Sequence, residues 1–333
     1  MRVTVVINAH SVVDVRKSMM TAWLSSVFQG ASFSVDSLAG DASFRRYFRA
    51  HTADQTFVVM DAPPEKENCD AFIAITNAFK YSAARFPHIV ASDVSQGFLL
   101  LSDFGDCQLQ QVLTNESADH LYHCAMDTLL QIQHCAGIAD YTLPHFNDAL
   151  YWREFEIFDT WYIKKNLNKT LSTQDENNLK RTYQFLIDSF AKQPTVFVHR
   201  DYHSRNIMVC PDDQLGILDF QDAVWGTITY DLVSLLKDCY IAWSSQRIEK
   251  WVVYFYERLR RENKIMDCDF ELFMRWFDFA GLQRHLKCLG IFSRLHFRDH
   301  KHHYLKEIPR VLNYVTTVCE KYPEFQALKN IVV

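Results

Sequence analysis

Residues 195–220 limit the possible folds of this chain more than any other segment. They read TVFVHRDYHSRNIMVCPDDQLGILDF. Three short apolar runs, TVFV, NIMV and LGIL, are typical of strands, and the Pro-Asp-Asp sequence between the last two is typical of a turn. The sequence therefore predicts a strand, a polar loop (HRDYHSR) and a hairpin. Since the surrounding sequence is helical, this segment favours a mixed α+β fold and excludes an all-helical one.

The first hundred residues are predicted to be mostly sheet with one helix. Residues 43–60 read as two strands, and HIVASDV and FLLLSD, joined by a Gln96-Gly97 turn, read as a second pair. Between residues 68 and 86, apolar residues at helical spacing predict a helix that Pro87 ends.

After Asp103 the periodicity becomes helical. Helices are predicted around residues 121–132, 179–190 and 248–259 and from residue 270 onward. A capping box, Thr173 with Glu176, is predicted to open the second of these helices. We expect a small sheet-rich N-lobe over residues 19–103 and a larger, mainly helical C-lobe over 104–333. Residues 1–18 fit poorly with this pattern and are expected to be an extension, either disordered or upstream of the true start.

Composition excludes several classes of protein. Of the 333 residues, 48% are hydrophobic and only 9 are Gly and 8 Pro, which excludes collagen-like and largely disordered chains. A net charge of −5 gives no reason to expect nucleic acid as a partner. The nine cysteines are scattered, without C-x-x-C spacing, as expected of a reduced cytoplasmic protein. No apolar run is long enough for a signal peptide or a membrane span, so no membrane partner is expected.

The polar loop carries the chemistry of the chain. His199, Asp201 and Asn206 have the spacing H-x-D-x-x-x-x-N, and Asp219 follows eighteen residues after Asp201. Phosphoryl transfer requires one carboxylate that orients the attacking hydroxyl, and an amide oxygen and a second carboxylate that hold Mg²⁺. Mg²⁺ needs few protein oxygens, because it also takes phosphate oxygens and retains water. The set therefore favours phosphoryl transfer.

Two other motifs compete with this interpretation. Asp103-Phe104-Gly105 is a literal D-F-G, but it precedes the HRD sequence by about a hundred residues, whereas the kinase order is the reverse. We interpret Ser102, Asp103 and Phe104 as a connection between lobes with a possible adenine contact. His199 and His203 have the spacing of a zinc-binding H-E-x-x-H, but that site needs a continuous helix, and strand patterns flank this pair.

At these residues the sequence resembles the aminoglycoside phosphotransferase and choline kinase superfamily, from about residue 22 to the end. Within it, five segments are similar to bacterial anomeric kinases that phosphorylate N-acetylmuramate and N-acetylglucosamine at C1 in peptidoglycan recycling: GDASFRRYF, VVMDAPPEKE, GFLLLSDFGD, HRDYHSRNIMV and LDFQDAVWGTITYDLVSLLKDCY. The resemblance implies a protein-kinase-like two-lobed fold that uses ATP and Mg²⁺. By position it makes Asp201 the catalytic base, Asn206 and Asp219 the Mg²⁺ ligands, His199 a brace of the loop, and Asp231 a structural aspartate.

The nucleotide side departs from the kinase pattern. Met60 stands about where a kinase strand carries the Lys that contacts the phosphates. Three arginines of the preceding strand are candidates to replace it: Arg45, Arg46 and Arg49. Alternation puts Arg46 on the opposite face from the other two, and the sequence does not say which face matters. Alternatively, all three only solvate an exposed face. Ser43 follows Gly40 in a segment that offers backbone N–H groups but no full Gly-rich loop.

The acceptor side is expected to be basic. Residues 284–310 hold seven Lys or Arg against two acids, a local charge of +5, so the rest of the chain sums to −10. Such a region suits an anionic substrate, for which the lactyl carboxylate of N-acetylmuramate is a candidate. The tetrad 300–303 is more simply a solvated turn. The candidate acceptor contacts are His203, Arg205, Asp222, Arg284 and His285, and Arg205 and Asp222 are equally well explained as an ion pair.

Three functions are consistent with these features. The leading one is an ATP- and Mg²⁺-dependent kinase of a small amino sugar. The same chemistry on an aminoglycoside, a choline-like amine or another alcohol is the second, although a basic acceptor side disfavours cationic acceptors. The third is a non-catalytic nucleotide-binding protein, which the retention of Asp201, Asn206 and Asp219 together disfavours. Oligomeric state is not predicted by any pattern in the sequence.

Overall fold

The computed structural model describes residues 14–38, 44–211 and 214–332. The chain forms two compact units. Unit 1 takes the residues up to 76 together with 87–103, and unit 2 takes 77–86 together with the residues from 104 onward. Among the described residues, no helix combines the length and the apolar character that crossing a membrane requires.

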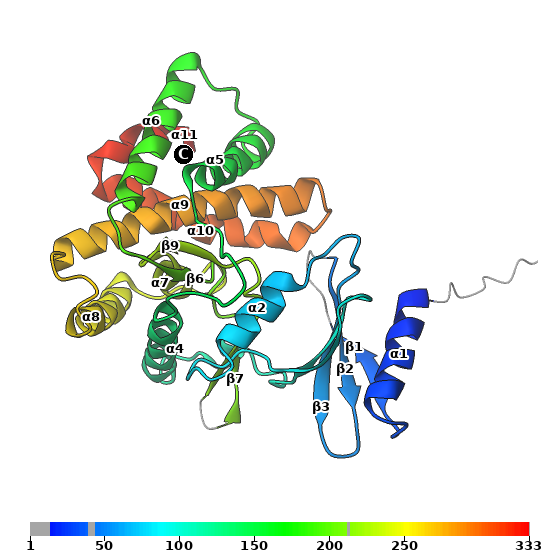
Figure 1. The fold of residues 1–333 in the computed structure, drawn as a ribbon. Helices are drawn as coiled ribbons and strands as arrows, with labels where there is room; N and C mark the ends of the chain where they lie inside the picture. The colour runs from blue at the N-terminus through cyan, green and yellow to red at the C-terminus, as the bar shows by residue number, and fades with distance from the viewer. Residues whose placement is uncertain (1–13, 39–43, 212–213, 333) are drawn as a thin grey trace, which may run out of the picture. The chain divides into compact units, whose positions relative to one another are not determined.

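Unit 1 is built on an antiparallel sheet in which both predicted strand pairs are present (Figure 1). The first strand of the sheet was not predicted. In spatial order the five strands are β1 (Ser34–Ser37), β2 (Arg46–His51), β3 (Thr56–Asp61), β5 (Phe98–Ser102) and β4 (Ile89–Asp93).

A helix that was not predicted, α1 (Val15–Val27), packs against this sheet. Met20 and Leu24 are fully buried with the sheet residues Phe48 and Val59. The last residues of the expected extension are ordered: Asp14 caps the helix by accepting a hydrogen bond from the Lys17 N–H, and residues 15–18 form its first turn. Residues 1–13 lie outside the described part.

The predicted helix after β3 is shorter than expected. α2 (Asp70–Ala78) ends eight residues before the predicted position. Beyond it the Ser82 hydroxyl accepts a hydrogen bond from the Ala84 N–H, a local bond that competes with helix formation. Phe79 and Phe86 stack with their ring centroids 4.3 Å apart, which keeps the following turn compact.

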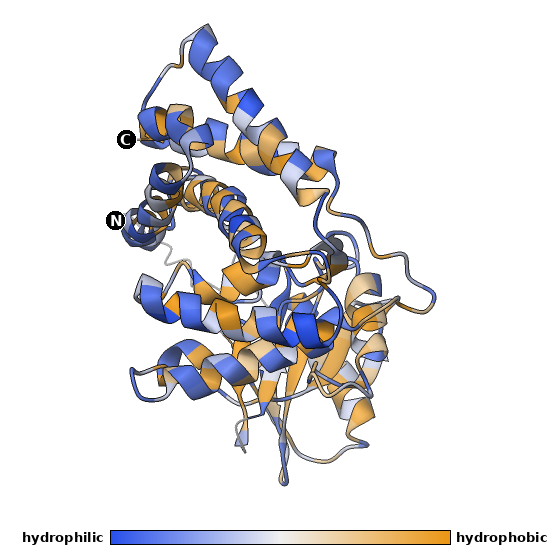
Figure 2. Ribbon diagram, turned by 90° about the vertical axis from the view of Figure 1, so that its left-hand side faces the viewer, coloured by the Kyte–Doolittle hydropathy of each residue, from blue (hydrophilic) through white to orange (hydrophobic). Residues whose placement is uncertain are grey.

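Unit 2 is mainly helical, as predicted, and its longest helix, α9 (Phe270–Phe297), is largely buried. α5 (Asp148–Ile157), the π-helical segment η1 (Phe158–Asn166), α7 (Tyr230–Leu236) and α10 (Ile308–Lys321) pack around it. Figure 2 shows apolar and polar residues on different sides of many helices, as expected of amphipathic helices around a core. The other helical segments are α3 (Leu109–Val112), α4 (Ala118–Gln133), α6 (Thr173–Phe190), α8 (Ser245–Arg261), η3 (His302–Glu307), η4 (Pro323–Phe325) and α11 (Gln326–Val332).

The start of α6 corrects the predicted capping box. The N-cap is Ser172, whose hydroxyl accepts a hydrogen bond from the Asp175 N–H at 3.1 Å, and Thr173 is the first helical residue. Ser172 and Asp175 have the same three-residue spacing as Thr173 and Glu176, and the hydroxyl of Ser172 also donates to the Asp175 carboxylate at 2.7 Å. The cap therefore lies one residue earlier than predicted.

Four short strands of unit 2 hold the polar loop. β7 (Ile207–Val209) pairs with β8 (Leu215–Ile217) in the predicted hairpin. β6 (Thr195–Val198) pairs instead with β9 (Val224–Thr227), which was not predicted. Residues 199–206 therefore run from one two-stranded sheet to the other.

Candidate active site

Two backbone N–H groups at the start of the polar loop bind one carboxylate. Asp231, in the first turn of α7, is fully buried. It accepts hydrogen bonds from the N–H groups of His199, at 2.6 Å, and Arg200, at 3.0 Å. Because the donors belong to the backbone, the carboxylate fixes the path of the loop rather than a side chain.

His199 is buried and neutral. Burial lowers its pKa to about 4. Its Nε2–H donates to the Leu218 carbonyl at 2.9 Å, and its Nδ1 accepts from the Asp201 N–H at 3.3 Å. The imidazole therefore joins the loop to the chain just before Asp219, and both ring nitrogens are occupied. A zinc site at His199 and His203 is excluded by these bonds.

Asp201 follows a strained residue and faces positive charge. Arg200 has a φ of +75°, a left-handed conformation that non-glycine residues rarely adopt. Burial raises the pKa of Asp201, but the positive charges of Lys287 and Arg284 outweigh it and hold that pKa well below its usual range. Its side chain keeps 40% of its accessible surface. Asp201 is thus an ionised carboxylate that a ligand can reach.

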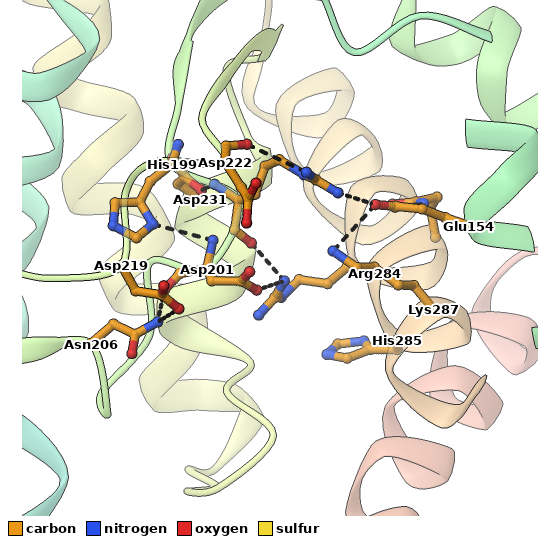
Figure 3. A network of polar contacts seen from close by, with 12 residues as sticks. Glu154, His199, Asp201, Asn206, Asp219, Asp222, Asp231, Arg284, His285 and Lys287 are labelled. Carbon is orange, nitrogen blue, oxygen red and sulfur yellow. Dashed lines mark hydrogen bonds and ion pairs between the residues drawn. The ribbon is translucent and has the colours of Figure 1, made fainter. Parts of the chain in front are cut away.

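Asn206 and Asp219 lie next to each other, beside Asp201 (Figure 3). The Asn206 Nδ2 donates to the Asp201 carbonyl at 3.0 Å and lies 3.5 Å from the Asp219 Oδ2. Gln221 orients the other Asp219 oxygen with a hydrogen bond of 2.7 Å. One amide oxygen and one carboxylate form a hard-oxygen set that fits Mg²⁺ completed by phosphate and water oxygens. Among the described residues, no group of three or more His, Cys, Asp or Glu side chains is arranged to hold a metal.

A buried ion cluster adjoins Asp201, and the sequence did not predict it. Glu154 of α5 is 2% exposed and accepts from Arg200 at 2.6 Å and from Gln283 at 2.8 Å. Lys287 lies 3.2 Å from the same carboxylate (Figure 3). Burial raises the pKa of Glu154, but the positive charges of Lys287 and Arg200 lower it by a larger amount. The pKa of Glu154 is therefore below its usual value. The cluster joins α5 and α9 to the polar loop.

Three of the predicted acceptor residues lie on or near the loop. His203 packs edge-on against Tyr240. Arg205 stacks on the same ring at 3.5 Å and donates to Gln110 at 2.9 Å. Asp222 is exposed, and its carbonyl accepts from Arg200 at 3.4 Å. The predicted ion pair between Arg205 and Asp222 is not among the contacts of the described residues.

The other two acceptor candidates, Arg284 and His285, are buried within α9. Arg284 donates to the Arg200 carbonyl at 2.8 Å and to the Asp201 Oδ1 at 3.3 Å. His285 bonds the Lys237 carbonyl at 2.9 Å and stacks on Tyr314. These contacts tie both residues to the protein, and a contact with substrate stays a prediction for each. The predicted basic stretch is mixed, since its first residues belong to the core whereas 300, 302 and 303 are exposed.

The predicted arginines of unit 1 each contact a carboxylate. Arg45 pairs with Glu67 at 2.9 Å, Arg46 with Asp61 at 2.6 Å, and Arg49 with Asp103 at 2.6 Å. The Ser102 hydroxyl accepts from the His88 N–H at 2.9 Å. Phe104, in unit 2, lies so close to Gly216 that a Cβ there would come within 2.4 Å of its ring. Ser43 lies outside the described residues.

The strand register shows which arginines share a face with Met60. Arg46 is opposite Asp61, and its neighbour Phe48 faces α1. Met60 is opposite Tyr47 and is fully buried. Since side chains alternate along a strand, Arg49, and by continuation Arg45, lie on the face of Met60, away from α1. Arg46 lies on the α1 face.

Comparisons with known proteins agree with this fold. The family described as the phosphotransferase enzyme family matches residues 34–262. An N-acetylmuramate/N-acetylglucosamine kinase of Pseudomonas putida is 39% identical, with 96% of each chain aligned. The protein of the same name from Neisseria meningitidis is 34% identical, over 96% of this chain and 95% of that one.

Solved structures resemble this chain at low identity. An ADP-bound aminoglycoside phosphotransferase superposes with a TM-score of 0.60 at 14% identity, covering 89% of this chain and 97% of that chain. A choline kinase of Streptococcus pneumoniae gives 0.64 at 13% identity, covering 90% and 99%. They confirm the predicted protein-kinase-like fold. The chain belongs to the phosphotransferase enzyme family.

Proposed function

We propose that this protein transfers the γ-phosphoryl group of ATP to the anomeric C1 hydroxyl of N-acetylmuramate, N-acetylglucosamine or both, in peptidoglycan recycling. The observation that carries the proposal is the contact of Asp201 with Asn206 and of Asn206 with Asp219. The relatives named for these two sugars support the acceptor.

Asp201 would act on the acceptor hydroxyl. One of its carboxylate oxygens accepts from Arg284, and no hydrogen bond from a described residue reaches the other. Its low pKa makes it a weak base, suited to orienting a hydroxyl and taking its proton late in the transfer. An anomeric hydroxyl is more acidic than an ordinary alcohol because the ring oxygen withdraws electrons. A weakly basic aspartate therefore matches an anomeric acceptor.

The nucleotide phosphates would be neutralised by the metal and by arginine. Mg²⁺ held by Asn206 and Asp219 would neutralise charge on the β- and γ-phosphates when bound. Arg45 is our candidate for the missing strand lysine, because it lies on the face of Met60 and pairs with Glu67, as a kinase Lys pairs with a helix Glu. Arg46, bound to Asp61 on the α1 face, would support the fold.

The test is ³¹P and ¹H NMR of ATP, Mg²⁺ and each sugar with the wild-type protein. A sugar 1-phosphate is expected, and Asp201→Asn should lower kcat by about 10²–10⁴-fold. Arg45→Met should raise KM for ATP, whereas the matched variant Arg46→Met should mainly lower stability. If neither sugar yields a 1-phosphate while choline or an aminoglycoside is phosphorylated, the sugar assignment is wrong.

A further inference from the structure

Arg284 is a buried cation whose contacts all lie at the catalytic loop or around it. It occupies the middle of α9 and is 2% exposed. Its Nη1 donates to the Arg200 carbonyl at 2.8 Å and to the Asp201 carboxylate at 3.3 Å (Figure 3). The Tyr230 ring lies 5.8 Å from the guanidinium carbon. A guanidinium this deep needs a carboxylate as partner, and Asp201 is the acid paired with it among the described residues.

The neighbouring acid does not serve Arg284. Glu154 accepts hydrogen bonds from Arg200 and Gln283 and pairs with Lys287. The three cations near Asp201 are therefore divided: two are paired with Glu154, and Arg284 contacts Asp201 itself. This division leaves Asp201 with one bonded oxygen and one that a substrate can approach.

The backbone of the loop is held from both sides at Arg200. Its N–H donates to Asp231 and its carbonyl accepts from Arg284. Between these two bonds the residue has a φ of +75°, a conformation that persists only where the surroundings impose it. If the bond to Arg284 were lost, the carbonyl would be free to turn, and the Asp201 side chain would turn with it.

We propose that Arg284 is a positioning residue for the transfer step. It fixes the peptide after Arg200 and holds one oxygen of Asp201, so that the other oxygen points to the acceptor hydroxyl. The inference rests on the proposed function for the role of Asp201, and it assigns Arg284 to the protein side of the site rather than to the sugar.

The experiment compares Arg284→Ala and Arg284→Lys with Arg275→Ala. Arg275 is on the same helix but half-exposed and paired with Glu324, away from the loop. For Arg284→Ala we expect kcat to fall about 100-fold, the cost of a misplaced catalytic group, with KM for ATP and sugar nearly unchanged. Added guanidinium ion should restore part of kcat, and Arg284→Lys should be intermediate. Arg275→Ala should match the wild type.

Hydrogen exchange measured by mass spectrometry gives a readout that does not need turnover. In full-length Arg284→Ala, amides of residues 199–206 should exchange faster, while the rest of unit 2 exchanges as in the wild type. An unchanged kcat in Arg284→Ala would overturn the proposal. So would a loss of kcat that neither guanidinium ion nor Arg284→Lys relieves, if amides throughout unit 2 also exchange faster. If Arg284→Ala does not fold, Arg284→Lys with unchanged exchange at 199–206 and unchanged kcat would overturn it too. A wild type that phosphorylates neither sugar counts against the proposed function, and exchange still decides whether Arg284 holds the loop.

Discussion

Two buried carboxylates, one in each unit, bind two cations each but have different surroundings. Asp61, at the end of β3, is fully buried and bonds Arg16 of α1 and Arg46 of β2. Glu154, in α5, bonds Arg200 of the polar loop and Lys287 of α9. Both clusters join a helix to its neighbours, so from the ion pairs alone they look equivalent.

The difference lies in the cations. The side chains of Arg16 and Arg46 keep 24% and 38% of their surface, so water can still solvate them if Asp61 is lost. Lys287 keeps 8%, and Arg200 directly precedes Asp201. Loss of Glu154 would leave buried charge unpaired next to Asp201, the proposed catalytic residue. Asp61 therefore serves the fold, whereas Glu154 serves both the fold and the geometry around Asp201.

Glu154→Gln should have the largest effect. Removing one partner of a buried ion cluster costs about 3–5 kcal/mol, because the remaining charges are uncompensated. We expect that loss in urea unfolding at pH 7.5, and a lower kcat in the fraction that stays folded. Glu154→Gln combined with Lys287→Met, which removes the anion and the more deeply buried of its two cations, should recover part of the stability. A Glu154→Gln variant with wild-type stability and kcat would remove the distinction between the two clusters.

Asp61→Asn should affect stability alone. Two partly solvated arginines lose a counter-charge but keep other acceptors, Asp14 for Arg46 and the Gln96 carbonyl for Arg16, so we expect a cost of about 2–3 kcal/mol, smaller than for Glu154. Corrected for the folded fraction, kcat with the amino sugar should stay within about twofold of the wild type, since the cluster lies on the α1 face of the sheet. The control is Asp36→Asn on the edge strand β1, an exposed acid beside His51. A large loss of kcat in stable Asp61→Asn would show that the α1 face serves catalysis as well.

The polar loop and the proximity of its residues to Asp219 could be predicted from the sequence because these residues are close in the chain. His199, Asp201, Asn206 and Asp219 are all within one strand–loop–hairpin segment, and their spacing is fixed by local geometry. The sequence of α1 also carries a helical signal, since Met20, Leu24 and Val27 have helical spacing.

The ion clusters could not be predicted in this way. Glu154 and Lys287 are 133 positions apart, and only tertiary packing brings them together. The alternation of side chains along the strand showed that Arg46 and Arg49 lie on opposite faces of the sheet. It could not show which of the two faces α1 covers. For the same reason the sequence did not show that Arg284 and His285 are buried, since a basic run does not reveal which of its members lie in the core.

The smallest predicted effect is a change in the pH dependence of stability, and it comes from His285, a buried neutral group of α9. Burial lowers the pKa of His285 to about 3, whereas in the unfolded chain it is near 6.5. Below pH 6.5 the unfolded chain takes up a proton at this residue and the folded protein does not. Its contribution to stability is therefore complete above pH 6.5 and is lost as pH falls, by up to about 1.4 kcal/mol per pH unit.

His285→Gln should flatten this dependence, because a glutamine amide can still donate to the Lys237 carbonyl without titrating. We expect urea unfolding to show that, between pH 6.5 and 5, the variant loses about 1–2 kcal/mol less than the wild type. The pKa of His199 is also lowered by burial, but His199 is present in the wild type and in His285→Gln. Its contribution to the pH dependence therefore cancels when the two are compared. The exposed His303→Gln serves as the control and should keep the wild-type slope. Parallel pH profiles for the wild type and His285→Gln would mean that His285 takes up a proton in the folded protein as well. α9 would then carry a further buried positive charge, close to Lys237.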